Sequence, residues 1–320
     1  MTGVPHDAPA VCLQGVVKRF GARNVVDGVS LDIAQGEFFA LLGANGAGKT
    51  TLISMLSGLA RPTAGAVQVL GRDVVREPYL TRRLLGVVPQ ELVFDPFFTV
   101  RECLRLQSGY FGLRRNDAWI DELLHHLGLS QQAEQNMRAL SGGMKRRVMV
   151  AQALVHKPPV IVLDEPTAGV DVELRQSLWQ FITSLNRHGH TVLLTTHYLE
   201  EAEALCSRIG MLKQGRLVAL DSTHALLARF ASTHLLLRTR GQPMPPALLD
   251  ASREVGSRRA WTVRDATEVE RILAQLRAAG CEIEELEVRR ADLEDAFLQI
   301  MGTQAPSPSS RPSPARELAA

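Results

Sequence analysis

The sequence predicts an α/β protein with a parallel sheet at its core, an antiparallel β subdomain, a helical insertion and a small C-terminal α+β domain. Apolar runs at residues 38–42, 160–163 and 191–195 are typical of strands buried on both faces, as in a parallel sheet. A glycine-rich stretch joins the first run to a helix-like segment, and titratable residues follow the other two. Open α/β sheets bind their ligands at these strand ends.

Length and composition are those of a soluble globular protein. The chain has 320 residues, 45% apolar and 22% charged, which favours one large domain and a small one. No apolar run approaches the roughly 18–20 residues that a membrane span needs, and the N-terminus lacks a secretion signal. We therefore expect a cytoplasmic protein. The net charge of +2 indicates no nucleic-acid partner, and the four cysteines lack metal-site or disulfide spacing.

The glycine-rich stretch at residues 43–51, GANGAGKTT, fits the phosphate-loop pattern G-x-x-x-x-G-K-[ST]. Its glycines let backbone N–H groups surround a triphosphate, and the following helix adds its positive end. Lys49 is expected to reach the β- and γ-phosphates, Thr50 to hold Mg²⁺ and Thr51 to bond the α-phosphate. The alternative is a turn that binds nothing. The predicted phosphate-binding residues are Gly43, Asn45, Gly46, Ala47, Gly48, Lys49, Thr50 and Thr51.

Two strands precede the loop, at residues 11–20 and at 25–33, the second interrupted by a turn at Gly28. Phe20 ends the first strand. Its ring is suited to stacking on an adenine base, and packing in the core is the alternative.

A strand at residues 85–88 ends just before Gln90, which is placed to point toward a bound ion or to lie in an exposed loop. Phe94, Phe97 and Phe98 then crowd one loop, as a core plug or as an exposed patch awaiting a partner. Helical periodicity from residue 99 predicts a helical subdomain over about 91–157.

Ser141, Gly142 and Gly143 stand directly before a strongly helical run, which makes a second anion-binding helix start or a simple N-cap. The basic residues at 145–147 are expected on a solvated face, because consecutive residues of a helix point in different directions.

Asp164 and Glu165 follow the buried strand at 160–163. One carboxylate can hold Mg²⁺ through water, and the other can deprotonate the attacking water. Adjacent residues of a strand face opposite sides, which suits this division of roles. His197 ends the next buried strand and can donate to a γ-phosphate, although it could also be a helix cap.

Beyond residue 220 the sequence predicts a small α+β domain at 221–303, with a helix opened by a capping box at Thr267 and Glu270. Residues 304–320 are rich in Pro and Ser and are expected to be disordered. Residues 1–10 form a short N-terminal extension.

The motifs GANGAGKTT, VVPQ, LSGGM, VIVLDEP, AGVD and TTHYLEEAE, in this order, resemble those of the ATP-binding cassette (ABC) ATPases, which have the P-loop NTPase fold. The LSGGM stretch makes the resemblance specific, because other P-loop families lack it. It covers roughly residues 11–220 and is most similar to the ATPase subunits of ABC-2 type exporters of the daunorubicin-resistance and nodulation-factor types. The ending DLEDAFLQIMG also looks like the C-terminal domain of that subfamily.

The resemblance implies roles for individual residues. Phe20 would stack on adenine, Gln90 would sense Mg²⁺ and the permease, and the Ser141–Gly143 stretch would grip the γ-phosphate of the opposite subunit. Glu165 would be the general base, Asp171 a contact across the dimer and His197 the γ-phosphate switch. Phe20 replaces a more usual tyrosine and Met144 a glutamine, and neither change removes a group needed for hydrolysis.

The resemblance also implies the assembly. It predicts a homodimer closing around two ATP molecules with Mg²⁺, bound to an ABC-2 type permease on a separate chain at the cytoplasmic face of the inner membrane. The alternative is an ABC ATPase without a permease, of the translation or DNA-repair type. The single phosphate loop and the absence of sustained heptads between Lys49 and Ser141 disfavour that alternative. Choice of the transported substrate is expected to lie in the permease.

Overall fold

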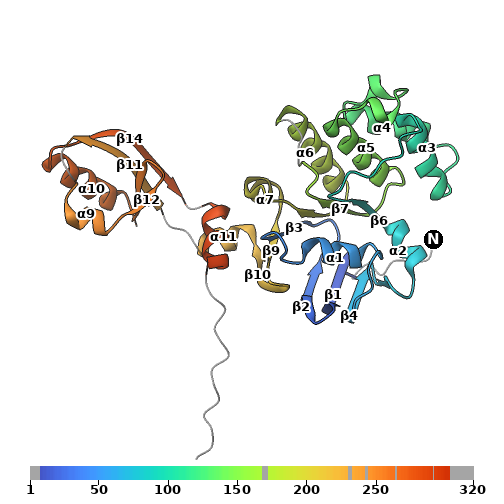
Figure 1. Ribbon diagram of the computed structural model, residues 1–320, viewed down its shortest axis with the longest axis horizontal. Coiled ribbons are helices and arrows are strands. Elements are labelled where there is room, and N and C mark those ends of the chain that lie inside the picture. Colours follow the sequence, from blue (N-terminus) through green and yellow to red (C-terminus); the bar gives the residue numbers. More distant parts are fainter. Residues whose placement is uncertain are drawn as a thin grey trace, which may run out of the picture.

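The computed structural model describes residues 8–167, 172–229, 233–241, 244–263, 265–290 and 292–302. Within these residues a six-stranded sheet forms the centre of the molecule, in the order β10-β9-β3-β8-β7-β6 (Figure 1). Neighbours from β9 to β6 run parallel, and β10 pairs antiparallel with β9. The predicted parallel core is confirmed. Its strands are β3 (Phe38–Gly43), β6 (Leu85–Val88), β7 (Val160–Asp164), β8 (Thr191–Thr195), β9 (Arg208–Lys213) and β10 (Arg216–Ser222).

Alternating side chains of β3 explain why its sequence is apolar throughout. Phe38, Ala40 and Leu42 belong to one hydrophobic core, whereas Phe39 and Leu41 belong to a second core on the opposite face. Helix α1 (Lys49–Leu56) contributes to the second core, and α6 (Val172–Arg187) to the first. Both faces of the sheet are therefore covered, as expected for parallel strands.

An antiparallel sheet of order β2-β1-β4-β5 packs into the second core, as predicted. Its strands are β1 (Val11–Phe20), β2 (Arg23–Ile33), β4 (Ala64–Val69) and β5 (Arg72–Asp73). The turn predicted at Gly28 is wrong. Strand β2 continues through Gly28, whose φ of 72° lies within a shift of the β1–β2 register. A glycine bulge thus absorbs the extra residue without ending the strand.

Between β6 and β7 lies the helical insertion, which consists of α3 (Val100–Tyr110), α4 (Asp117–His126) and α5 (Gly142–Leu154). Figure 1 shows these helices grouped beyond the β6–β7 side of the sheet. Thr99 and Glu102 form a capping box that starts α3. A shorter helix, α2 (Pro78–Leu84), leads directly into β6.

A third sheet, of order β12-β13-β11-β14, forms the C-terminal part of the chain. Helices α9 (Pro246–Asp250) and α10 (Ala266–Ala278) pack on it through a separate apolar core. The capping box predicted at Thr267 and Glu270 is wrong, because the Asp265 side chain accepts a bond from the Glu268 N–H and starts α10 two residues earlier. The strands are β11 (Thr233–Gly241), β12 (Arg253–Val255), β13 (Arg258–Val263) and β14 (Cys281–Arg290).

Two further helices connect this sheet with the main core. Leu226 of α8 (Thr223–Arg229) and Leu293 of α11 (Leu293–Gly302) are both buried in the first core. Helix α11 lies between the C-terminal sheet and the central sheet in Figure 1. Helix α7 (Leu199–Leu205), which follows β8, packs against α11. None of the described helices is both long and apolar enough to span a bilayer. The tail at 304–320 and residues 1–7 lie outside the described residues.

Candidate nucleotide-binding site

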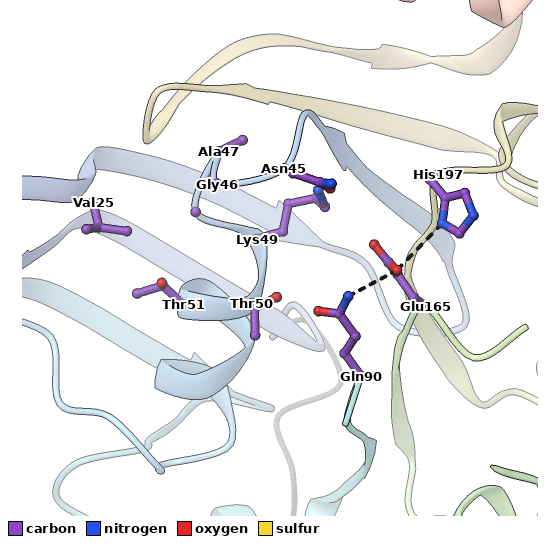
Figure 2. A pocket seen from close by; sticks show the side chains of 11 residues that line it. Val25, Asn45, Gly46, Ala47, Lys49, Thr50, Thr51, Gln90, Glu165 and His197 are labelled. Carbon is purple, nitrogen blue, oxygen red and sulfur yellow. Dashed lines mark hydrogen bonds and ion pairs between the residues drawn. The ribbon is translucent and has the colours of Figure 1, made fainter. Parts of the chain in front are cut away.

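A cleft of about 600 Å³ lies where strands of the central sheet end (Figure 2). It is lined by the phosphate loop, which follows β3, and by Gln90, Glu165 and His197, which follow β6, β7 and β8. Because parallel strands end at one edge of a sheet, four stretches far apart in sequence meet in one cleft. The lining residues are Val25, Asn45, Gly46, Ala47, Gly48, Lys49, Thr50, Thr51, Gln90, Glu165 and His197.

The glycines of the phosphate loop are required by its geometry. Gly48 has a φ of 108°, and a Cβ there would lie 2.8 Å from the Val25 carbonyl oxygen. A Cβ at Gly43 would lie 2.5 Å from the Leu212 carbonyl oxygen. Gly48 is also the N-cap of α1 and leaves that helix start without a side-chain cap. The N–H groups at this helix start are therefore suited to an anion.

Lys49 lies against the loop with its side chain largely buried, at 8% exposure. Its Nζ donates to the carbonyl oxygens of Gly43 at 2.6 Å and Ala44 at 3.3 Å. Burial lowers the pKa of Lys49, while the nearby carboxylates of Glu165 and Asp164 oppose that shift. The ammonium group is thus held by weak neutral acceptors beside two acids, where a phosphate could bind it more strongly.

Asp164, at the end of β7, is only 2% exposed and accepts hydrogen bonds from the hydroxyl groups of Thr195 and Thr50. Burial raises the pKa of Asp164, and these two bonds act against that rise. A carboxylate, a threonine hydroxyl and the amide oxygen of Gln90 form the oxygen donor set that Mg²⁺ prefers. The residues present therefore fit a magnesium ion.

Glu165 lies between Gln90 and His197 in the cleft (Figure 2). Gln90 Nε2 donates to Glu165 Oε2 at 3.2 Å, and His197 Nδ1 lies 3.5 Å from the same oxygen. The backbone of Glu165 has a φ of 50°, in the left-handed region that non-glycine residues seldom adopt. Strand β7 ends at Asp164, so the side chains of Asp164 and Glu165 need not point to opposite faces of the sheet. The left-handed backbone at Glu165 instead leaves both carboxylates near Lys49. Local strain of this kind is common at functional sites.

The sequence interpretation missed the role of Glu201, which is 9% exposed and accepts hydrogen bonds from three segments. Thr167 Oγ1 donates to it at 3.1 Å, Trp179 Nε1 at 3.0 Å and Thr196 Oγ1 at 2.9 Å. The carboxylate thereby joins the segment after Glu165, helix α6 and the residue before His197. Three neighbouring glutamates in one helix give no sequence signal for which of them is buried.

The expectation that residues 145–147 form a solvated face is wrong for two of them. Arg146 is 4% exposed and Arg147 is 5% exposed. Arg146 donates to the carbonyl oxygens of Pro89 and Gln90, and Arg147 to those of Leu127 and Gly128. Each guanidinium donates to a different neighbouring loop. Every residue has a backbone carbonyl group, so the sequence does not indicate which of these groups will accept a hydrogen bond from an arginine.

Some predicted site residues lie apart from the cleft. Phe20 does not line it and is 55% exposed, with Lys18 Nζ 4.9 Å from its ring centroid, so the alternative of core packing is wrong. Ser141 caps α5 by accepting from the Met144 N–H at 3.2 Å, and none of the residues 141–143 lines the cleft. Asp171 lies outside the described residues. Val25 lines the cleft, but an apolar strand residue carries no signal for this role.

The chain is similar to proteins of known family over most of its length. The family model of the ABC transporter matches residues 26–168. Nod factor export ATP-binding protein I of Paraburkholderia xenovorans (strain LB400) is 40% identical, over 92% of this chain and 98% of that protein. Daunorubicin resistance ATP-binding protein DrrA3 of Streptomyces coeruleorubidus is 38% identical, over 92% of this chain and 96% of that protein.

Solved structures agree with these relatives. An ATP-binding subunit of an ABC transporter is 30% identical with a TM-score of 0.66, and the match covers 69% of this chain and 93% of that one. A dimeric ATP-binding cassette in a post-hydrolysis state, bound to ADP and Pi, is 28% identical with a TM-score of 0.61 and matches over 67% of this chain and 98% of that one. The chain thus has a phosphate loop, a cleft at the ends of its parallel strands and relatives that match it over nearly all of their length. It belongs to the ABC transporter family and is one of its ATPases.

Proposed function

We propose that the chain is the ATP-hydrolysing subunit of an ABC-2 type membrane exporter and works as a homodimer on a separate permease. The observation that carries this proposal is the cleft in which the phosphate loop, Gln90, Glu165 and His197 meet. The names of the full-length relatives, which include Nod factor export and daunorubicin resistance proteins, support export as the use of this activity.

ATP binds through its phosphates at the loop. The N–H groups at the start of α1 and the Lys49 ammonium stabilise the charge on the β- and γ-phosphates, and Thr51 bonds the α-phosphate. Thr50, Gln90 and Asp164 would hold Mg²⁺, which would supply neutralisation of phosphate charge. Phe20, exposed at the end of β1, offers its ring to the adenine base.

Hydrolysis needs a base beside the attacking water. The Glu165 carboxylate takes a proton from this water as the water oxygen bonds to the γ-phosphorus and the bond to the β-phosphate oxygen breaks. Gln90 and His197 both lie within 3.5 Å of Glu165 Oε2 and orient that carboxylate. His197, whose side chain is 52% exposed, can also donate to the γ-phosphate.

A second copy completes each site in this proposal. The helix start at Ser141–Gly143 has N–H donors for an anion but lies outside the cleft of its own chain. In a head-to-tail dimer, this helix start of one subunit contacts the γ-phosphate held by the other. The dimeric cassette among the similar structures supports the formation of a dimer.

The permease docks beside Gln90 in this proposal, at the cytoplasmic face of the inner membrane. Val93 is 68% exposed and Phe97 is 75% exposed, whereas Phe94 and Phe98 pack partly buried against the first core. The aromatic loop therefore combines both alternatives, a core plug and an exposed patch. Exposed apolar side chains in the loop that follows Gln90 suit a partner that responds to ATP.

Replacing Glu165 with Gln tests the proposed chemistry. The amide keeps the shape of the side chain but accepts a proton poorly, so kcat should fall by roughly 10²–10⁴-fold while ATP binding stays. The variant should elute as an ATP-held dimer in size-exclusion chromatography with Mg·ATP. Glu200→Gln, which changes an exposed carboxylate, is the matched control. Hydrolysis by Glu165→Gln at the wild-type rate would rule out Glu165 as the base.

A further inference from the structure

Arg146 joins helix α5 to the loop that carries Gln90. Its Nη1 donates to the Pro89 carbonyl oxygen at 2.6 Å and its Nη2 to the Gln90 carbonyl oxygen at 2.7 Å. The planar guanidinium thus spans two successive carbonyl groups with its two terminal nitrogens. A fork of this kind fixes orientation as well as distance.

Because Arg146 is buried, breaking these two hydrogen bonds would cost considerable free energy. Arg146 is 4% exposed, and a buried cation needs acceptors because it has lost its contact with water. Burial lowers the pKa of Arg146, while attraction from Asp164 and Glu165 opposes that shift. If the backbone at Gln90 moved alone, the guanidinium would remain buried without its acceptors. The loop and the helix are therefore expected to move together.

One end of this connection lies in the cleft, and the other leads to the helix start that the proposed function places against the ATP of the second subunit. On one side, the backbone of Gln90 is held so that its side-chain amide reaches Glu165 Oε2 at 3.2 Å. On the other side, Arg146 lies in the second turn of α5, the helix that begins at Ser141–Gly143. A shift of this helix start would be carried to Gln90 through one side chain.

We propose that Arg146 is a positioning residue that sets Gln90 in the cleft and couples it to the start of helix α5. The inference rests on the proposed function of Gln90 in ATP hydrolysis. Arg146 does not line the cleft, and its two hydrogen bonds reach the site through the loop that carries Gln90. When Ser141–Gly143 of one subunit meets the ATP of the other, Arg146 transmits that contact to the Gln90 of its own subunit.

Arg147 provides a matched control on the same helix. It is 5% exposed, and its Nη1 donates to the carbonyl oxygens of Leu127 and Gly128 at 2.5 and 3.1 Å. Removing either guanidinium takes a buried cation and its carbonyl bonds out of α5. Of the carbonyl partners described for the two side chains, those of Arg146 lie in the loop of Gln90 and those of Arg147 lie at residues 127–128.

Hydrogen exchange of the nucleotide-free protein tests the physical connection. Arg146→Met should increase deuterium uptake in peptides covering residues 86–96, whereas Arg147→Met should increase it around residues 124–132 and leave 86–96 unchanged. Arg146→Lys, which keeps the charge but cannot span both carbonyl groups, should fall between wild type and Arg146→Met. It serves as the second variant if Arg146→Met does not fold. Wild-type exchange in Arg146→Lys, or unchanged exchange at 86–96 in a folded Arg146→Met, would overturn the proposal.

A double-mutant cycle with Gln90→Ala tests the functional coupling. Arg146→Met alone should lower kcat between about tenfold and a hundredfold, as small displacements of positioning groups do. In the Gln90→Ala background the same change should lower kcat clearly less than in wild type, because the side chain that Arg146 positions is already gone. Arg147→Met should have the same effect on kcat in both backgrounds. Equal effects of Arg146→Met in both backgrounds would refute the coupling.

The role of Arg146 and the proposed ATPase function can each be refuted without the other. If wild type hydrolyses ATP and Arg146→Met keeps its kcat, the role of Arg146 is refuted and the proposed function stands. If wild type does not hydrolyse ATP, the proposed function fails, and the exchange at residues 86–96 still decides whether Arg146 holds the Gln90 loop.

Discussion

Glu201→Ala should destabilise the protein more than any change at its exposed neighbours. The substitution removes the acceptor of Thr167, Trp179 and Thr196, whose donor atoms lie 2.9–3.1 Å from the carboxylate. A buried donor left unsatisfied costs about 1–3 kcal/mol. The two hydroxyl groups can rotate toward other acceptors, but the indole N–H of Trp179 cannot. We therefore expect the free energy of unfolding to fall by about 1–3 kcal/mol, a sizeable part of the 5–15 kcal/mol typical of a folded domain.

Urea unfolding at pH 7.5 and 25 °C, followed by circular dichroism, measures this loss. Glu201→Gln keeps one acceptor oxygen and should lose about half as much as Glu201→Ala. Glu200→Ala removes an exposed carboxylate of the same helix and should stay within about 0.5 kcal/mol of wild type. A loss below about 1 kcal/mol in Glu201→Ala, or an equal loss in Glu200→Ala, would refute the reasoning.

Three further predictions concern the dimer, the aromatic loop and His156, which follows helix α5 and stacks on Phe111. Mixing inactive Lys49→Ala and Ser141→Arg chains should restore nucleotide-dependent dimerisation and some ATPase activity, because one site of the mixed dimer is intact. If differently tagged chains form heterodimers that show neither signal, the result would count against the head-to-tail arrangement. Phe97→Ala should weaken co-purification with the permease but spare the basal ATPase, and normal assembly of this variant would exclude the docking role. Phe98 is half-buried, so Phe98→Ala should lower the free energy of unfolding by about 2–3 kcal/mol. Burial lowers the pKa of His156 to about 4, so between pH 6.5 and 4 the unfolded chain binds the extra proton and stability falls as pH falls. Between pH 7.5 and 5.5, the free energy of unfolding measured in urea should fall by about 1 kcal/mol more for wild type than for His156→Phe. Equal falls in the two proteins would contradict this prediction.

The sequence determined the parts of the site that depend on local pattern. The phosphate loop could be predicted because Gly43, Gly48 and Lys49 stand at fixed spacing between a strand and a helix. Glu165 and His197 could be placed with it because each follows a buried strand, and parallel strands end at a common edge. The central sheet and the antiparallel sheet followed from the same apolar patterning.

Tertiary structure alone decided what the charged helix residues do. Lys145, Arg146 and Arg147 are consecutive in sequence, and which of them is buried depends on the loops that pack against α5. The same holds for Glu200 and Glu201, of which only the second meets buried donors from three other segments. Apolar burial has a sequence period, because it repeats with the geometry of the strand or helix. A buried charge has none, because its energy is set by the partners that the fold brings to it.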